Sequence, residues 1–316
     1  MNPRVVLVTG ATGFIGRNLV SLLDSMGYHV RRALRDGRDR GDDVVVGSIG
    51  PTTDWAAAVA GVDSVIHLAA RVHHRNEEHA SELYDAVNTQ GTIQLAQAAA
   101  RAGVSEFVFL STILVNGSST DGRGPFTPED EVVPRGVYGQ SKAAAETALQ
   151  RLASHSRMRV AVVRPPLVYG RDSLGNFRHL AGAIRRRVPL PLGLVDNKRA
   201  FISVQNLTSF VVHLLGLPAA PPYGIYLVSD SEQISTAAFV RRIGQAMNRT
   251  PILLPVPLSV LTLALQAIRP ELRHSLVGSM EIDTSAALST GWTPPLSMSQ
   301  GLRLAVGTSS SPHTPW

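Results

Sequence analysis

The sequence predicts an α/β fold: a doubly wound parallel sheet followed by a smaller C-terminal α/β domain. Short apolar runs alternate with helical patterns up to Gly170. Most of these runs are continuously apolar, as expected for strands covered on both faces. Beyond Gly170 the alternation fades and prolines become frequent. The expected parts are a first domain over 1–170, a second over 171–308, later segments at about 200–230 that return to the first sheet, and a disordered tail over 309–316.

The individual elements follow from periodicity and from turn residues. A proline pair at 165–166 ends the sixth strand, and residues 116–135, rich in Gly, Ser, Pro and Asp, are expected to form a loop. An apolar stretch at 258–268 is too short to cross a bilayer and is expected to form a buried or surface helix, with weak membrane association as a minor alternative. The expected strands are 5–8, 28–34, 44–46, 64–68, 107–110, 159–163, 201–204 and 223–228. The expected helices start at 14 and cover 55–60, 77–103, 137–153, 177–187, 204–217 and 236–247.

The glycine-rich turn after the first strand predicts a dinucleotide site of the Rossmann type. Gly10 permits the tight turn, Gly13 lets the backbone approach a pyrophosphate, and Gly16 lets the helix pack closely on the strand. The free N–H groups and the positive end of the helix dipole face the phosphates. The spacing is GxxGxxG, and it indicates a dinucleotide site because it forms the turn between a strand and a helix.

Composition narrows the class of protein. The chain has 316 residues, 44% hydrophobic, which suffices for a large core. The absence of cysteine excludes disulfides and thiolate metal sites, and no metal site is predicted. The net charge of +6 comes almost entirely from scattered arginines, which favours a small anionic substrate over a nucleic acid. The N-terminus has no signal-peptide pattern, so a cytoplasmic protein without stable membrane insertion is expected.

The end of the second strand bears on the choice between NAD and NADP. NAD enzymes place an acidic residue there for the ribose hydroxyls, whereas this chain has Leu34 and then Arg35, with Asp36 slightly beyond. An arginine can pair with a 2′-phosphate, which favours NADP(H) and leaves NAD(H) as the alternative. Ser48 and Ile49, after the third strand, are expected near the adenine.

A second motif carries the candidate chemistry. Tyr138 and Lys142 lie four residues apart at the start of a helix and therefore share one face. An ammonium beside a phenol favours the phenolate, so the pKa of Tyr138 is expected to fall below its usual value of about 10. Such a tyrosine can act as an acid or a base near neutral pH. Ser111 and Thr112 place hydroxyls at the carboxyl end of the fifth strand.

Taken together, these motifs resemble the extended short-chain dehydrogenase/reductase family, in particular its nucleotide-sugar epimerase, dehydratase and 4-ketoreductase group. The matching stretches are TGATGFIG (9–16), HLAA (67–70), VNTQGT (87–92), STILVNG (111–117), YGQSK (138–142), RPPLVYG (164–170) and, more weakly, RAFISVQNL (199–207) and WTPP from Trp292. They occur in the family's order, so an oxidoreductase acting on a nucleotide sugar is implied.

The resemblance also implies roles for individual residues. It implies a catalytic triad of Thr112, Tyr138 and Lys142, with Thr112 rather than Ser111 at the hydroxyl position, and it makes His67 a core residue. The implied cofactor-binding residues are Gly10, Thr12, Gly13, Phe14, Ile15, Gly16, Arg35, Ser48, Ile49, Leu68, Ala69, Ala70, Asn88, Tyr138, Lys142, Pro165 and Val168. The implied substrate-binding residues are Thr112, Asn176, Arg199 and Arg273, of which Arg199 and Arg273 would bind phosphate. The resemblance allows a homodimer, which is common among relatives, whereas the sequence itself does not determine the oligomeric state.

The reaction is narrowed by what the motifs lack. Family dehydratases carry an Asp-Glu pair where this chain has Ile113 and Leu114, so the general acid and base for elimination are missing. The missing ribose acid, Arg35 and the stretches RVHH, VNG, RPPLVYG and PLPLG (189–193) favour a bacterial NADPH-dependent reductase. It would reduce the C4 ketone of a UDP-4-keto-6-deoxy sugar, of the UDP-quinovosamine type, for surface polysaccharide synthesis.

Two alternatives stay open. One is an NAD-dependent UDP-hexose 4-epimerase of the UDP-glucose 4-epimerase kind, which keeps its cofactor bound and returns the hydride to the same sugar. The other is a non-catalytic NADP-binding redox sensor or assembly protein; such proteins typically lose the tyrosine or the lysine, and this chain keeps both Tyr138 and Lys142.

Overall fold

A seven-stranded parallel sheet forms the centre of the structure, which is a computed structural model describing residues 3–37, 40–72, 80–218, 220–268 and 270–307. The strand order is β3-β2-β1-β4-β5-β6-β9. Strands β2 and β3 are added on one side of β1 and the later strands on the other, so the order of addition switches between β1 and β4. Every neighbouring pair is parallel, which confirms the doubly wound fold expected from the sequence. The strands are β1 (Val5–Thr9), β2 (His29–Leu34), β3 (Val44–Val45), β4 (Ser64–His67), β5 (Glu106–Leu110), β6 (Arg159–Arg164) and β9 (Tyr223–Leu227).

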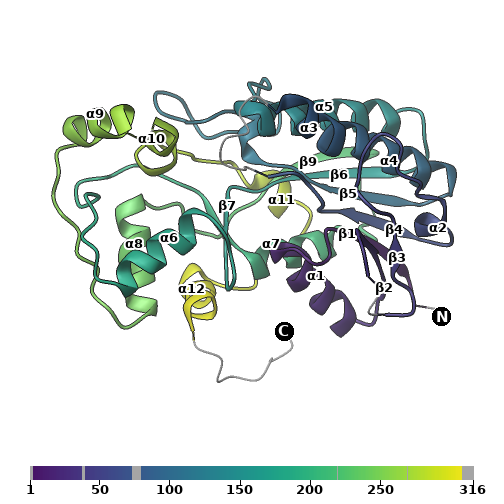
Figure 1. The fold of residues 1–316 in the computed structure, drawn as a ribbon, viewed down its shortest axis with the longest axis horizontal. Helices are drawn as coiled ribbons and strands as arrows, with labels where there is room; N and C mark the ends of the chain where they lie inside the picture. Colours follow the sequence, from purple (N-terminus) through teal and green to yellow (C-terminus); the bar gives the residue numbers. More distant parts are fainter. Residues whose placement is uncertain (1–2, 38–39, 73–79, 219, 269, 308–316) are drawn as a thin grey trace.

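Helices cover both faces of this sheet. Successive residues of a strand point to opposite faces, so each strand contributes to two separate hydrophobic clusters. Val6 and Val8 of β1 belong to one hydrophobic cluster, and Leu7 between them belongs to another. The first cluster lies under α1 (Phe14–Ser25), α7 (Val204–His213) and α11 (Ser285–Leu288). The second lies under α2 (Ala56–Val59), α4 (Gly91–Arg101) and α5 (Gly136–Ala153). The sheet is therefore buried on both sides, as Figure 1 shows.

A second group of elements lies beyond the carboxyl edge of the sheet, at the left of Figure 1, and is called the smaller lobe here. Its two-stranded parallel sheet joins β7 (Leu167–Tyr169) to β8 (Phe201–Ser203). Its helices have their own hydrophobic cluster, built around Tyr169, Phe177 and Phe239. They are α6 (Asn176–Arg185), α8 (Thr236–Ala246), α9 (Leu258–Ile268), α10 (Pro270–Leu276) and α12 (Met298–Val306).

The structure corrects several expected boundaries. The helix expected over 77–103 is, in the described part, α3 (Ser81–Tyr84), a π-helical stretch (Asp85–Gln90) and α4, because a wide turn interrupts it. The segment at 201–203 pairs with β7 instead of returning to the main sheet, whereas β9 and α7 do return to it. The elements β7, α10, α11 and α12 were not expected from the sequence, although the capping box of Ser297 and Gln300 marks the start of α12. Residues 73–79 and 308–316, which include part of RVHH and the expected tail, lie outside the described ranges.

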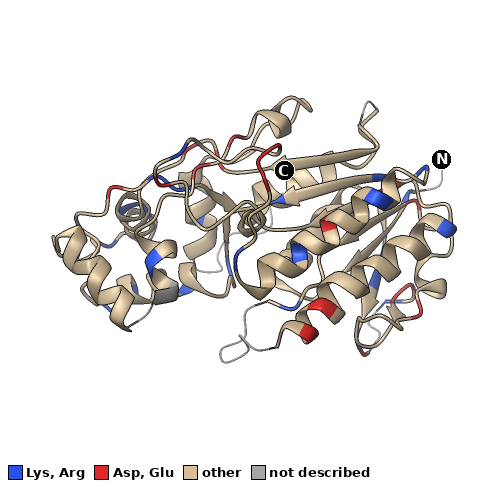
Figure 2. Cartoon of the chain, turned by 90° about the horizontal axis from the view of Figure 1, so that it is seen from above, with Lys and Arg blue, Asp and Glu red and all other residues tan. Residues whose placement is uncertain are grey.

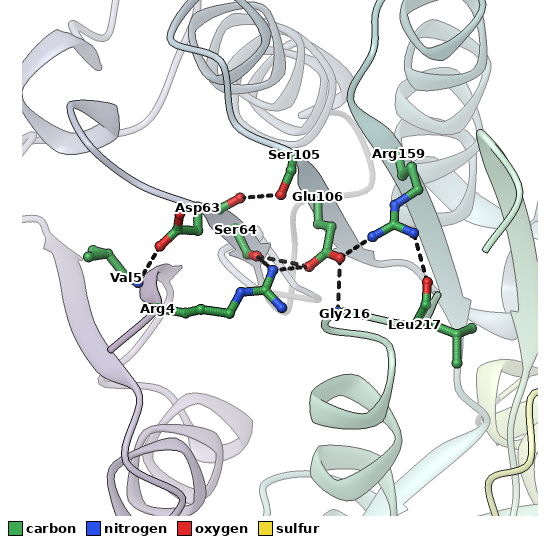
Figure 3. A network of polar contacts seen from close by, with 9 residues as sticks. All are labelled: Arg4, Val5, Asp63, Ser64, Ser105, Glu106, Arg159, Gly216 and Leu217. Carbon is green, nitrogen blue, oxygen red and sulfur yellow. Dashed lines mark hydrogen bonds and ion pairs between the residues drawn. The ribbon is translucent and has the colours of Figure 1, made fainter. Parts of the chain in front are cut away.

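The amino ends of four strands are tied together by one buried carboxylate, shown in Figure 3. Glu106, which opens β5, accepts hydrogen bonds from Arg4 (2.7 Å) and from the Ser64 hydroxyl (2.9 Å). Arg159, which opens β6, forms an ion pair with the same carboxylate, and the Gly216 N–H donates to it over 2.9 Å. Glu106 is buried, so its charge depends on these donors. This network lies at the end of the sheet opposite the ligand-binding edge and stabilises the fold.

Replacing the carboxylate tests that role. We expect Glu106→Gln to lower the free energy of unfolding by about 2 kcal/mol, since two arginines lose their charged partner while keeping partial access to water. Glu129→Gln, at an exposed glutamate, should change it by less than about 0.5 kcal/mol. Chemical denaturation of both variants measures the difference, and equal stabilities would show that Glu106 has no stabilising role.

Candidate active site

The turn between β1 and α1 has the backbone geometry that a pyrophosphate needs. Gly10 has a φ of +67°, and a Cβ there would lie 2.8 Å from the Ala69 nitrogen. A Cβ on Gly16 would lie 2.1 Å from the Gly10 carbonyl oxygen, so each position requires glycine. Gly13 precedes α1 and is exposed, which leaves the N–H groups of the first helical turn open to a ligand. The expected approach to phosphate is therefore unobstructed, and the turn fits a dinucleotide.

The expected ribose contacts lie at the carboxyl end of β2, which carries Arg31 and Arg32 and is followed by Arg35. Arg31 donates hydrogen bonds to the carbonyls of Ala58 and Ala60. Arg32 forms an ion pair with the buried Asp43. Arg35 is exposed directly after the strand, and Asp36 beside it is exposed as well. Of the three arginines, Arg35 is thus the one placed for a ligand.

The adenine positions expected from the sequence follow β3. Ser48 is exposed, and its carbonyl accepts a hydrogen bond from the Thr53 hydroxyl over 3.1 Å. Ile49 packs so closely on the start of α4 that a Cβ on Gly91 would lie 2.4 Å from its Cγ2. Both positions are fixed by contacts with the fold and remain predictions as adenine contacts.

The loop after β4 lies against the glycine turn. Leu68 donates its N–H to the Thr9 carbonyl (3.3 Å), and Ala69 donates to the Thr9 hydroxyl (3.2 Å). Leu68, Ala69 and Ala70 are all partly exposed, as expected for residues beside a cofactor.

Asn88 fixes this loop to α5. Its Oδ1 accepts from the Arg71 N–H (2.7 Å), and its Nδ2 donates to the Arg71 carbonyl and to the Ser141 hydroxyl, both over 3.0 Å. Asn88 is fully buried and lies in the π-helical turn. Its observed role is structural support between the β4 loop and the helix that carries Tyr138.

His67 is the core residue that the sequence indicated. Its ring lies between the hydroxyls of Thr9 (2.6 Å) and Thr92 (2.9 Å). Burial, together with the charge of Lys142, lowers the pKa of His67 to about 3. The ring is therefore neutral at ordinary pH and links β1, β4 and α4.

At the end of β5, neighbouring hydroxyls face different partners. The Ser111 hydroxyl donates to the buried Glu146 carboxylate, which also pairs with Arg164. The Thr112 hydroxyl, in contrast, accepts the Leu114 N–H over 3.3 Å and caps a short 3₁₀ turn (Ile113–Val115). Adjacent residues of extended chain point to opposite sides, so this division supports Thr112 as the hydroxyl of the site.

Lys142 lies beneath the same strand end. It is 1% exposed, donates from Nζ to the Leu110 carbonyl over 2.8 Å, and lies 4.3 Å above the Phe109 ring. Burial lowers the pKa of Lys142 to about 7, against the opposing effect of the Glu146 carboxylate. The lysine is thus built into the carboxyl edge of the sheet and is close to half protonated at neutral pH.

The expected pKa of Tyr138 was wrong for this structure. Burial, aided by the nearby Tyr84, raises the pKa of Tyr138 to about 12 rather than lowering it. Lys142, whose ammonium donates to the Leu110 carbonyl, does not offset this rise. Tyr138 lies in the first turn of α5, and its phenol is protonated at neutral pH.

Comparison with known proteins identifies the family. A profile described as the NAD dependent epimerase/dehydratase family matches residues 6–229, which is more than half of the chain. The chain belongs to this family.

Individual members of the epimerase/dehydratase family show how far the likeness extends. The chain is 37% identical over 309 residues to a UDP-glucose 4-epimerase of Vibrio cholerae, covering 95% of this chain and 94% of that protein. It is 26% identical, over 96% and 94%, to the N-acetyl-alpha-D-glucosaminyl-diphospho-ditrans,octacis-undecaprenol 4-epimerase of Escherichia coli O157:H7. Its fold matches the structure of MoeE5 in complex with UDP-glucose and NAD with a TM-score of 0.76, at 23% identity and coverage of 95% and 96%.

The residues expected on the substrate side come from the smaller lobe: Asn176 from α6, Arg199 from the segment before β8, and Arg273 from α10. Arg199 is buried and donates from one guanidinium nitrogen to the carbonyls of His274 (2.8 Å) and Gly278 (2.6 Å). Burial lowers the pKa of Arg199 to about 10, partly offset by Asp121, so it stays charged. Arg273 precedes His274 in α10, which brings the two arginines to adjacent parts of the backbone.

The remaining expected residues lie along the same edge. Asn176 is partly buried at the start of α6. Pro165 accepts the Ile113 N–H over 3.0 Å, and Val168 packs on the same hydrophobic cluster as Ile15 and Leu68. Within the described ranges, no group of three or more His, Cys, Asp or Glu side chains could hold a metal ion.

Sequence reasoning missed the polar network beneath the site. Glu146 and Arg164 form a buried ion pair, and Arg164 also donates to Asn116 over 2.9 Å. A glutamate four residues after Lys142 and an arginine at the end of an apolar strand were the available signals. The sequence analysis assigned neither residue a role in the site, because nothing local shows that the two meet.

The buried lysine predicts an unusual dependence of stability on pH. Between a folded pKa of about 7 and an unfolded value near 10, the unfolded chain holds one more proton at Lys142, so stability rises with pH. At pH 8 to 9 this amounts to about 1.4 kcal/mol per pH unit. Lys142→Met should remove that slope, whereas Lys198→Met, at the exposed second lysine, should keep it. Denaturation at several pH values measures the free energy of unfolding that tests this. Equal slopes for the wild-type protein and both variants would show that the pKa of Lys142 is not lowered in the folded state.

Proposed function

We propose that the chain is an NAD-dependent 4-epimerase of a UDP-hexose. The observation that carries this proposal is the 37% identity to a UDP-glucose 4-epimerase over nearly the whole of both chains. It favours the epimerase over the 4-ketoreductase that the motifs alone suggested. The arrangement of Thr112, Tyr138 and Lys142 on the carboxyl edge of the sheet is compatible with it.

Tyr138 is the proposed acid and base. Its phenol oxygen takes the proton of the C4 hydroxyl as the sugar is oxidised and returns it when the C4 ketone is reduced. The Thr112 hydroxyl would hydrogen bond to the same sugar oxygen and stabilise charge that develops on it. A bound nicotinamide would accept the C4 hydride and give it back. Because the pKa of Tyr138 is about 12 without ligands, proton transfer needs a positive charge close to the phenol in the complex.

Lys142 supplies part of that charge in the proposed complex. Its ammonium lies one helical turn from Tyr138 and is already fixed against β5 by the Leu110 carbonyl. A ligand that adds negative charge nearby would raise its protonated fraction, since its pKa of about 7 lies at the working pH. Lys142 thus acts as an adjustable cation next to the phenol.

The proposed substrate is a hexose joined to a diphosphate. Both relatives described above are named for 4-epimerisation of a glucose-type sugar carried on diphosphate. Arg199, which donates to the His274 carbonyl, and Arg273, the residue before His274, are the two cations that could face such a group, and Asn176 could bind the sugar or its phosphate. The roles of these three residues are part of the proposal.

The choice of NAD rests on the family and on solved neighbours that hold it. Asp36 would then contact the ribose hydroxyls in place of the missing acid at the strand end. Arg35 is the specific observation in favour of the alternative, an NADPH-dependent 4-ketoreductase. The epimerase and the ketoreductase differ in their need for added cofactor, because an epimerase recovers its oxidised cofactor in every turnover.

The decisive assay uses UDP-galactose without added cofactor. We expect the wild-type protein to convert it to UDP-glucose, and Tyr138→Phe to lower turnover by about 10³-fold while NAD binding changes less than threefold. The control is Tyr28→Phe, on the loop before β2, which should keep full turnover. Chromatography of the sugar nucleotides gives the rates.

Two outcomes would contradict parts of the proposal. One is full activity in Tyr138→Phe, which would contradict the role of the phenol as acid and base. The other is no conversion of UDP-galactose together with NADPH oxidation in the presence of a UDP-4-keto-6-deoxy sugar, which would establish the reductase.

A further inference from the structure

The helix α9 exposes an apolar face. Over its eleven residues, LSVLTLALQAI, it has no charged side chain, and Leu261 is its single buried residue. Val260, Leu263 and Ile268 are 56%, 71% and 75% exposed. Helical spacing places Val260, Leu263 and Ala267 on a face turned away from Leu261, with Leu263 almost directly opposite it. A helix that is apolar all round is normally buried, so this face indicates a surface that something else covers.

The chain beside α9 extends this apolar surface. Residues 188–194 run next to residues 252–254, joined by hydrogen bonds from Leu190 to Ile252 (2.9 Å) and from Gly193 to Leu254 (2.9 Å). Together with α9, these segments form what is called the outer patch here. Its large exposed apolar side chains are Val188, Leu194, Ile252, Leu254, Leu258, Val260, Leu263 and Ile268. They are eight of the seventeen such residues in the described part of the chain, and they lie at the outer end of the smaller lobe (Figure 1).

The surroundings of the outer patch are basic. Residues 173–195 and 233–270 contain eight arginines and not one Asp or Glu, so these two stretches carry more positive charge than the +6 of the whole chain. Arg185, Arg186 and Arg187 are exposed and lead directly into Val188. Arg249 is exposed and donates to the Arg185 carbonyl over 3.0 Å, which joins it to the same cluster. Figure 2 colours the Lys and Arg positions along the backbone blue, and the smaller lobe is at the left.

The apolar helix face and the basic cluster beside it together match one kind of binding partner. An apolar helix of about 16 Å, flanked by a polybasic cluster, matches the surface of an anionic bilayer: the apolar face enters the boundary of the acyl chains and the arginines meet the headgroups. None of the helices in the described residues is long and apolar enough to cross a membrane. We propose that the outer patch holds the protein on anionic lipid surfaces, with α9 lying in the plane of the interface.

A cysteine-free chain makes the proposal simple to test. In Leu263→Cys, labelled with a polarity-sensitive dye, vesicles of phosphatidylglycerol and phosphatidylcholine should shift the emission to the blue, whereas pure phosphatidylcholine should not. Met26→Cys is the control, because Met26 is 57% exposed at the end of α1, on the side of the large sheet, and its dye should stay in water.

Vesicle flotation of unlabelled variants measures affinity. Leu263→Glu, and separately the triple change of Arg185, Arg186 and Arg187 to Gln, should each weaken binding to anionic vesicles at least about 10-fold. Changing the exposed Arg101, Arg151 and Arg303 to Gln alters net charge equally and should change binding less than about threefold. Soluble sugar-nucleotide activity should be unchanged in all of these variants, since none lies in the candidate active site; this shows that they are folded.

Three results would overturn the proposal. Wild-type protein that fails to float with anionic vesicles would do so, as would equal binding by Leu263→Glu. The third is a dimer in solution that Leu263→Glu dissociates, which would assign the outer patch to self-association. Because vesicle binding is measured without substrate, its failure leaves the proposed epimerase untouched.

Discussion

The packing of α5 against the end of β5 is the constraint on which the candidate site depends. Three residues on one face of α5 make the contact: Gly139, Lys142 and Glu146. A Cβ on Gly139 would lie 3.0 Å from the Leu114 carbonyl oxygen, Lys142 donates to the Leu110 carbonyl, and Glu146 pairs with the buried Arg164. Since Tyr138 precedes Lys142 by one helical turn, these contacts also fix where the phenol lies. A change in the register of α5 would displace the phenol and would leave a buried charge without its partner.

Burial in this region sets the charge of the site before any ligand binds. His67 is neutral, Tyr138 is protonated, and Lys142 is close to half protonated at neutral pH. A site of low positive charge would not repel a cationic nicotinamide, and in the proposed epimerase the phenol would depend on that cation and on Lys142 to lose its proton. In the proposed epimerase, ionisation of Tyr138 is thereby coupled to cofactor binding.

The sequence predicted those parts of the molecule that local patterns determine. The apolar runs and the glycine turn at Gly10 to Gly16 were sufficient for the doubly wound sheet, and the spacing of Tyr138 and Lys142 was sufficient for their shared helix face. Contacts between distant segments were not predictable. The pairing of Glu146 with Arg164 and the position of Arg199 at the carbonyls of His274 and Gly278 depend on how the elements pack. The pKa of Tyr138 was mispredicted for the same reason, since its value follows burial that no local pattern reveals.

The type of reaction, like the fold, could be predicted from local motifs only in part. The motifs identified a family and ruled against elimination, but they favoured a reductase on the strength of Arg35. Similarity over 95% of the chain favours an epimerase instead, because it includes the smaller lobe as well as the motifs.

The measurement that tests the central claim most directly follows a deuterium atom at C4 of UDP-glucose. If Tyr138 exchanges only the hydroxyl proton and the hydride returns to the sugar that supplied it, the UDP-galactose product keeps the deuterium in full. Product that has lost the label to solvent, or to an added pool of nicotinamide cofactor, would contradict the account.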